Sequence, residues 1–191
     1  MTGVRIAFLP PVPALLASYA GLTDPVADLR AACLEAVAWL VADGPARVAV
    51  LGDPSSSTDV ARGVPQPLSR RVADELLDAV GYTSPRTGPP DHAPALLVLA
   101  NGSGRRSEKA PGHLDERAFD FDDSLGKALV SGDAAGLGRL DGALAGALLA
   151  SGCDALRSVA GLVHGDVAAQ TRYADDPFGV QYWVVTWQCG S

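Results

Sequence analysis

Short apolar runs alternate with longer amphipathic stretches along the first half of the chain, a pattern that predicts alternating strands and helices. Short apolar runs at 4–8, 47–52 and 95–100 predict strands, and the run at 47–52 is almost uniformly apolar, which is typical of a strand that is covered on both faces. Between these runs, apolar residues recur at helical spacing over 26–40 and 68–80. Because strands joined by crossover helices are parallel, we expect an α/β fold with a mostly parallel central sheet flanked by helices on both faces.

The second half of the chain has a less regular pattern. Helices are expected at 120–131 and 134–151, although each glycine in an exposed helix interior costs about 1 kcal/mol relative to alanine. A further helix is expected at about 154–163, followed by a polar loop that contains Tyr173. The aromatic and β-branched stretch at 180–187 predicts a final strand. With no internal repeat and no domain boundary, residues 1–191 are expected to form one α/β domain.

Composition and charge exclude some classes of function. The chain has 22 acidic and 15 basic residues and no cationic stripe, so we expect no nucleic-acid partner. Its three cysteines are far apart and offer neither a disulfide framework nor a CxxC metal motif. Pro10, Pro11 and Pro13 interrupt the apolar N-terminal stretch, and no uncharged span of 18 residues occurs elsewhere. We therefore expect a soluble, cytoplasmic protein that has no membrane partner.

Loops at the carboxyl ends of the strands are the first candidates for a site, because ligands of open α/β sheets bind there. Three such loops contain Pro11, Asp53 and Asn101, and we expect them to converge. The third loop, 101–120, carries eight charged residues, one histidine and three glycines. The glycine patterns of dinucleotide-binding loops and P-loops do not occur, so we do not expect nucleotide binding by these routes.

Few residues in these loops have the chemistry of a catalyst or a metal ligand. In NGSGR, Asn101 stands where the nucleophile-elbow pattern GxSxG needs its first glycine. Ser103 and His113 remain the catalytic candidates, and the alternative is that both are turn residues. The three histidines, His92, His113 and His164, stand singly, and the carboxylates form no convincing ligand set with them. We therefore expect no metal site.

Positive charge after the third predicted strand indicates a different kind of site. Arg105, Arg106 and Lys109 lie close together, and a guanidinium binds a carboxylate or phosphate through two parallel hydrogen bonds. We therefore expect a small anionic molecule to bind here. The expected ligand-binding residues are Pro11, Asp53, Asn101, Ser103, Arg105 and Arg106. The alternative is that Arg106 or Lys109 forms surface ion pairs with the loop's own acidic residues Glu108, Asp115 and Glu116, each contributing about 0 to 1 kcal/mol.

The chain contains, in this order, the segments LPPVPALL, DLRAACLEAVAWL, RVAVLG, ANGSGRRSEKAPGHLDERAFDFD, SGDAAGL and YADDPFGVQYW. Together they resemble the class III extradiol ring-cleavage dioxygenases, in the subunit-B-like branch of actinobacteria. The resemblance covers most of the chain and is most specific in the loop at 101–120 and at the pair Gly132-Asp133. It implies an α/β fold and, in active members, Fe(II) bound by two histidines and a glutamate. The iron binds a catecholic substrate, and another histidine acts as acid and base.

At the ligand positions the chain departs from this pattern. Pro11 stands where the resemblance implies the first histidine ligand, and the loop at 52–59 contains no histidine for the second. The acid-base histidine maps near Gly104, and the late helix offers only Asp154 in place of the glutamate. Two missing imidazoles remove most of the donor strength that retains Fe(II). We therefore expect a dioxygenase-like pseudoenzyme without bound iron, with Fe(II) as cofactor only if the family activity is retained.

Three classes of function remain open. The first is a binding or regulatory protein that takes a small anionic or aromatic molecule. The second is an enzyme of this fold, either an active ring-cleaving dioxygenase or one with another reaction. The third is a non-catalytic subunit or interaction module, as a hetero-subunit or as a homo-oligomer that uses the aromatic C-terminal strand YWVVTW.

Overall fold

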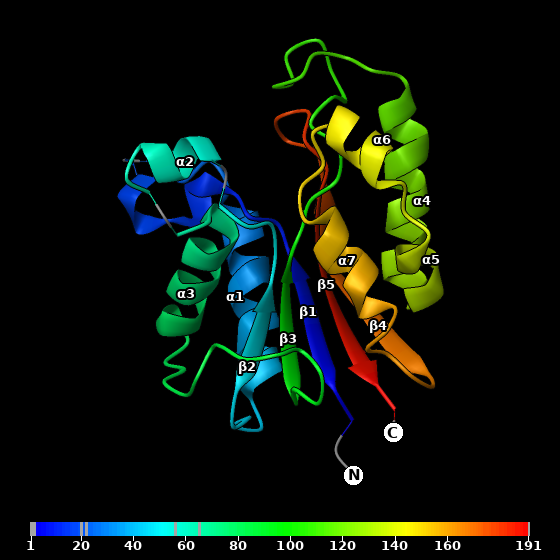
Figure 1. Cartoon of the computed structure of the whole chain (residues 1–191). Coiled ribbons are helices and arrows are strands. Elements are labelled where there is room, and N and C mark those ends of the chain that lie inside the picture. Colours follow the sequence, from blue (N-terminus) through cyan, green and yellow to red (C-terminus); the bar gives the residue numbers. More distant parts are fainter. Residues whose placement is uncertain (1–2, 20, 22, 56, 65, 191) are drawn as a thin grey trace.

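The chain folds around a five-stranded sheet in a computed structural model that describes residues 3–19, 21, 23–55, 57–64 and 66–190 (Figure 1). The strands are β1 (Arg5–Leu9), β2 (Val48–Leu51), β3 (Ala95–Leu99), β4 (Val167–Asp175) and β5 (Tyr182–Cys189). Their order is β2-β3-β1-β5-β4. The first three strands are parallel, whereas β5 runs antiparallel to β1, and β4 antiparallel to β5. The predicted mixed α/β class is confirmed, and the parallel arrangement holds for these three strands.

Helices cover both faces of the sheet, as Figure 1 shows. One face carries α1 (Ala27–Val41) and α3 (Leu68–Ala79). The other face carries α4 (Arg117–Ser131), α5 (Ala134–Gly138), α6 (Gly142–Ala147) and α7 (Cys153–Val159). The shorter elements are η1 (Pro13–Leu15), η2 (Ala17–Tyr19) and α2 (Ser57–Ala61). In the described residues, no helix has the length and apolar character that a membrane span requires.

The core consists of two apolar clusters, one on each face of the sheet. Along β1, Ala7 and Leu9 belong to the cluster under α1 and α3, whereas Ile6 and Phe8 belong to the cluster under α4 and α7. This division follows from the strand geometry, in which successive side chains point to opposite faces. Because both faces are covered by helices, β1 and β3 are buried almost throughout. The strand expected to be covered on both faces, β2, lies at the edge of the sheet and is buried only at Val48 and Ala49.

Three sequence-based expectations for the second half of the chain are wrong. The stretch at 134–151 forms two helices instead of one, because Asp133 and Asp141 each cap a separate helix. The Asp133 carboxylate accepts from Gly136 N at 2.7 Å, and the Asp141 carboxylate accepts from Ala143 N at 2.9 Å. The segment around Tyr173 is the edge strand β4, whose exposed polar side chains look like those of a loop. Finally, YWVVTW lies in β5 between β1 and β4 and is buried there, so it cannot form an interface between copies.

The cysteines behave as the sequence indicated. All three thiols are free; Cys33 and Cys189 are buried, and Cys153 is half-buried. Burial raises the pKa of the Cys33 thiol to about 12, which keeps it protonated.

Candidate functional site

The loops that follow β2 and β3 meet in front of α7, at the edge of the sheet where the parallel strands end. Asp53 Oδ2 accepts a hydrogen bond from Gly152 N at 2.8 Å. Asn101 Oδ1 accepts from both the backbone N and the side-chain Oγ of Ser151, each at 2.7 Å. Pro11 lies half-buried in the turn between β1 and η1. Asp53 and Asn101 thus hold Gly152 and Ser151 in place, and their hydrogen bonds stabilise the packing of these loops.

Ser103 is fully buried, and it binds Asp122 on α4 through two hydrogen bonds. Its Oγ donates to Asp122 Oδ2 at 2.6 Å, and its backbone N donates to Asp122 Oδ1 at 2.8 Å. Ser103 is 0 % exposed and Asp122 is 2 % exposed. A nucleophile must reach its substrate, and this hydroxyl is covered on all sides. These contacts describe a residue that attaches the loop after β3 to α4.

Arg106 joins three segments of the chain. Its Nη1 donates to Asp122 Oδ2 at 3.1 Å, and its Nε donates to Asp176 Oδ2 at 2.5 Å in the turn between β4 and β5. Its guanidinium also lies 4.9 Å from the centre of the Phe119 ring, within the range of a cation–π contact. Burial alone would lower the pKa of Arg106, but the hydrogen bonds to Asp176 and Asp122 outweigh it and raise the pKa. The charge of Arg106 is thus shared by two carboxylates, neither of which is among the loop acids considered as partners from the sequence.

Arg105 lies in a different environment from its neighbour. Its side chain packs against Gly112, where an added Cβ would lie 2.6 Å from Arg105 Cγ. The same Cβ would lie 2.8 Å from a methyl group of Leu149. Arg105 Nε is buried and has no hydrogen-bond partner in the described chain. Asp115 is close enough for the positive charge of Arg105 to help lower its pKa. In the described chain, the guanidinium of Arg105 is therefore less engaged in hydrogen bonds than that of Arg106.

The histidines are spread over two ends of the molecule. His113 is an exposed turn residue with a φ of 58°, and its Nδ1 lies 3.3 Å from Glu108 O. His92 and His164 line a pocket of about 560 Å³ beside Val4 and Gly190, at the opposite edge of the sheet from the loops after β2 and β3. Among the described residues, no group of three or more His, Cys, Asp or Glu side chains is placed to hold a metal ion.

The donors present do not fit the ferrous centre that the resemblance implies. Pro11 has no side-chain ligand atom, and all three histidines of the chain lie away from the positions that follow β1 and β2. Asp53, the carboxylate nearest to the end of β2, is bonded to Gly152 N. We therefore derive no chemical step that depends on iron.

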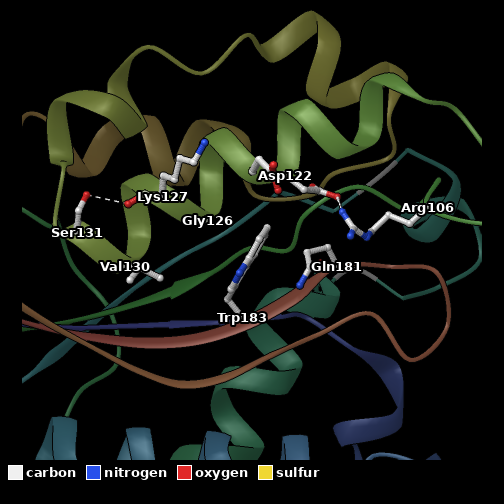
Figure 2. A pocket seen from close by; sticks show the side chains of 9 residues that line it. Arg106, Asp122, Gly126, Lys127, Val130, Ser131, Gln181 and Trp183 are labelled. Atoms are coloured by element: carbon white, nitrogen blue, oxygen red, sulfur yellow. Dashed lines mark hydrogen bonds and ion pairs between the residues drawn. The ribbon is translucent and has the colours of Figure 1, made fainter.

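An open pocket of about 570 Å³ lies between α4 and the first residues of β5 (Figure 2). Because β5 is antiparallel to β1, these residues lie at the edge of the sheet where β1 and β3 end. We call it the α4–β5 pocket; the lining residues that matter below are Arg106, Asp122, Asp123, Lys127, Val130 and Trp183. Of the residues predicted from the sequence, Arg106 alone lines this pocket.

Two hydrogen-bond donors in the α4–β5 pocket have no partner in the part of the chain that the structure describes. They are Lys127 Nζ and Trp183 Nε1. Trp183 lies under α4, and Gly126 permits this close approach, since an added Cβ there would lie 3.1 Å from Trp183 Cζ2 (Figure 2). The pocket thus combines a free ammonium with an indole, next to the ion pair of Arg106 and Asp122.

Comparison with known proteins does not assign the chain to a family. No family model matches its sequence, and no curated protein matches it significantly. The resemblance to the extradiol dioxygenases therefore stays a prediction from sequence motifs.

Sequence reasoning missed Lys127 and Trp183 as site residues. Lys127 is one of only two lysines in the chain, and its position on the exposed side of a helix is the usual place for a lysine. Trp183 was assigned correctly to the final strand, but its place at the site follows from the antiparallel direction of β5. A parallel final strand would have placed Trp183 at the opposite edge of the sheet.

The ion pair between Asp115 and Arg117, at the start of α4, should make the stability of the folded state depend on pH. Hydrogen bonds from Arg117 lower the pKa of Asp115 to about 2 from 3.8. The pair therefore stabilises the folded state fully above pH 3.8, and its contribution is lost as the pH falls through about 2. We expect Arg117→Gln to return the pKa of Asp115 towards 3.8, as measured by NMR titration of its carboxyl carbon. Arg139→Gln, which removes the exposed partner of Asp133, is the control and should leave Asp115 unchanged. An unaltered Asp115 titration in Arg117→Gln would contradict this assignment.

Proposed function

We propose that the chain is a small-molecule-binding protein on a dioxygenase-like scaffold, and that it binds a carboxylate-bearing ligand in the α4–β5 pocket without iron. The observation that carries the proposal is that Trp183 and Lys127, whose ammonium has no partner among the described residues, both line a pocket of about 570 Å³. A volume of this size lies within the range of small-molecule sites, which is roughly 300–1,000 Å³. The pocket also lies at the edge of the sheet where α/β proteins bind their ligands.

Lys127 is the residue best suited to hold the carboxylate. Arg106, the other cation of the pocket, already shares its charge between Asp122 and Asp176. A ligand carboxylate at Arg106 would have to displace one of these partners, whereas at Lys127 it displaces only water. The anion-binding role that the sequence indicated for Arg106 thus passes to Lys127 in this proposal.

Trp183 supports an apolar or aromatic ligand body. Trp183 is 8 % exposed, so only a small part of its indole faces the pocket, and a ligand ring can contact this part. Val130 adds an exposed apolar surface on the α4 side of the same pocket. Arg106 and Asp122 are held to the loop after β3 and to the turn after β4, so this wall of the pocket is formed before a ligand binds.

Binding of 3-phenylpropionate tests the proposal, with 3-phenylpropionamide as its uncharged analogue. We expect the carboxylate to bind about 1.4- to 5-fold more tightly than the amide, because an exposed ion pair contributes roughly 0.2–1 kcal/mol. Titration followed by the indole N–H signal of Trp183 in ¹H–¹⁵N NMR spectra measures both affinities. Trp187 provides an internal reference, since its Nε1 is buried and donates to Leu129 O at 2.7 Å.

Two matched pairs of variants locate the site. Lys127→Gln should abolish the preference for the carboxylate, and Lys109→Gln, at the chain's other lysine, should leave it intact. Val130→Trp should fill the pocket and prevent binding, whereas Val60→Trp should not, although Val60 is exposed to a similar degree (54 % against 53 %). Binding that survives Val130→Trp, or stoichiometric iron in the purified protein, would overturn the proposal.

A further inference from the structure

Two opposite charges on α4 line the α4–β5 pocket, and the described structure shows no ion pair between them. Asp123 and Lys127 are exposed side chains on α4, four residues apart, and both line the pocket. Four residues correspond to a rise of about 6 Å along a helix, so the two groups lie on neighbouring turns of one face. In the described chain neither side chain makes an ion pair or a hydrogen bond. A ligand in the pocket therefore meets one free carboxylate and one free ammonium.

The remaining charges of the pocket are already balanced by contacts within the protein. Asp122 accepts hydrogen bonds from Ser103 and from Arg106, and it is buried. Arg106 is held by Asp122 on one side and by Asp176 on the other. A ligand with only a negative charge would be attracted by Lys127 but repelled by Asp123. A ligand with only a positive charge would be attracted by Asp123 but repelled by Lys127. A molecule that carries both charges avoids both conflicts.

The pocket wall between these charges and the sheet is apolar. Trp183 lies beneath Gly126, which has no side chain to cover the indole, and Val130 continues this surface (Figure 2). Trp183 is only 8 % exposed, so its position is fixed by packing on the side away from the pocket. An aromatic ring is the ligand body that matches an indole best, since paired rings gain more than their buried area alone provides.

We propose that the ligand is a zwitterion of the α-amino-acid type with an aromatic side chain. Its carboxylate binds Lys127, its ammonium binds Asp123, and its ring packs on Trp183. This inference rests on the proposed function, because it concerns the same pocket and the same role for Lys127. It adds Asp123 as a residue that determines specificity, and it names the class of ligand.

L-Phenylalanine and its two singly charged analogues test the proposal. 3-Phenylpropionate lacks the ammonium of phenylalanine, and 2-phenylethylamine lacks its carboxylate. We expect phenylalanine to bind about 1.4- to 5-fold more tightly than each analogue, which is the effect of one additional exposed ion pair. The indole N–H signal of Trp183 reports binding, and that of Trp187 should not move because it is buried and bonded to Leu129 O.

Variants assign each preference to one residue. Asp123→Asn should remove the preference for phenylalanine over 3-phenylpropionate and leave the preference over 2-phenylethylamine. Lys127→Gln should have the opposite pattern. Asp28→Asn is the matched control, because Asp28 is an exposed carboxylate of α1, on the other face of the sheet, and it should change neither ratio.

The outcomes separate this inference from the function on which it rests. If 3-phenylpropionate binds through Lys127 and phenylalanine binds no more tightly, the zwitterion proposal is overturned while the proposed function stands. The same holds if Asp123→Asn leaves the ratio of the two affinities unchanged. If none of the three molecules shifts the Trp183 signal, both proposals are overturned.

Discussion

Replacing Asp122 with alanine should destabilise the folded chain by about 3–5 kcal/mol, the cost of removing one partner from a buried ion pair. Asp122 is 2 % exposed and accepts hydrogen bonds from Ser103 N, Ser103 Oγ and Arg106 Nη1. The alanine variant leaves both Ser103 donors buried without an acceptor. Among the described residues, it also leaves Arg106 with Asp176 as its remaining carboxylate partner.

Urea denaturation measures this loss as a fall in the free energy of unfolding. Asp123→Ala is the matched control for stability, because Asp123 is the next residue on α4 but is exposed at the open α4–β5 pocket and makes no hydrogen bond in the described chain. Its effect should stay within about 0.5 kcal/mol, as for most surface substitutions. A similar loss in the two variants would show that the network around Asp122 does not stabilise the protein. The network matters for function as well, because it fixes one wall of the α4–β5 pocket.

Gly152→Ala should destabilise the protein by about 2–5 kcal/mol. Two costs add up in this estimate: the left-handed backbone conformation of residue 152 and the steric clash of the added Cβ. Gly152 has a φ of 75°, in the left-handed region that residues with a Cβ rarely adopt. An added Cβ would also lie 2.3 Å from Leu99 O and 2.7 Å from Ala100 Cα. These are backbone atoms at the end of a central strand, so they cannot move aside. The substitution would separate this segment from Asp53, whose carboxylate accepts from Gly152 N.

Gly63→Ala separates the two causes. Gly63 has a similar φ of 77°, but an added Cβ would meet no heavy atom within 4 Å. Its substitution should therefore cost only about 1–2 kcal/mol, the cost of the left-handed conformation. Thermal or urea unfolding of both variants gives the comparison. Equal losses would mean that the close approach of Gly152 to β3 has no energetic effect.

The first half of the fold was accessible from local patterns in the sequence. β1, β2 and β3 follow from short apolar runs, and α1 and α3 follow from apolar residues at helical spacing. The approach of the loops after β2 and β3 follows from the rule that parallel strands end at the same edge, and Asp53 and Asn101 do bind adjacent residues there. These inferences succeed because each depends on neighbours in the sequence or on a general rule of topology.

The candidate site was harder to predict from the sequence, because Arg106 pairs with acidic residues that are far from it along the chain. Arg106 was expected to bind a ligand or a nearby acid of its own loop. Its actual partners are Asp122, 16 residues away, and Asp176, 70 residues away. No local pattern marks the pair with Asp176. Lys127 forms no ion pair in the described chain, although Asp123 lies one helical turn away from it on α4.

The sequence by itself determined the α/β class, the first three strands, the absence of histidines where an iron-binding dioxygenase would need them, and the position of a charged loop after the third strand. Those properties are set by residue identity and by short-range periodicity. Only the tertiary structure decided that the C-terminal hairpin is antiparallel and places Trp183 against α4. It also decided which charges remain free, because an ion pair forms where folding brings two groups within about 4 Å, and that distance is independent of their separation in the sequence.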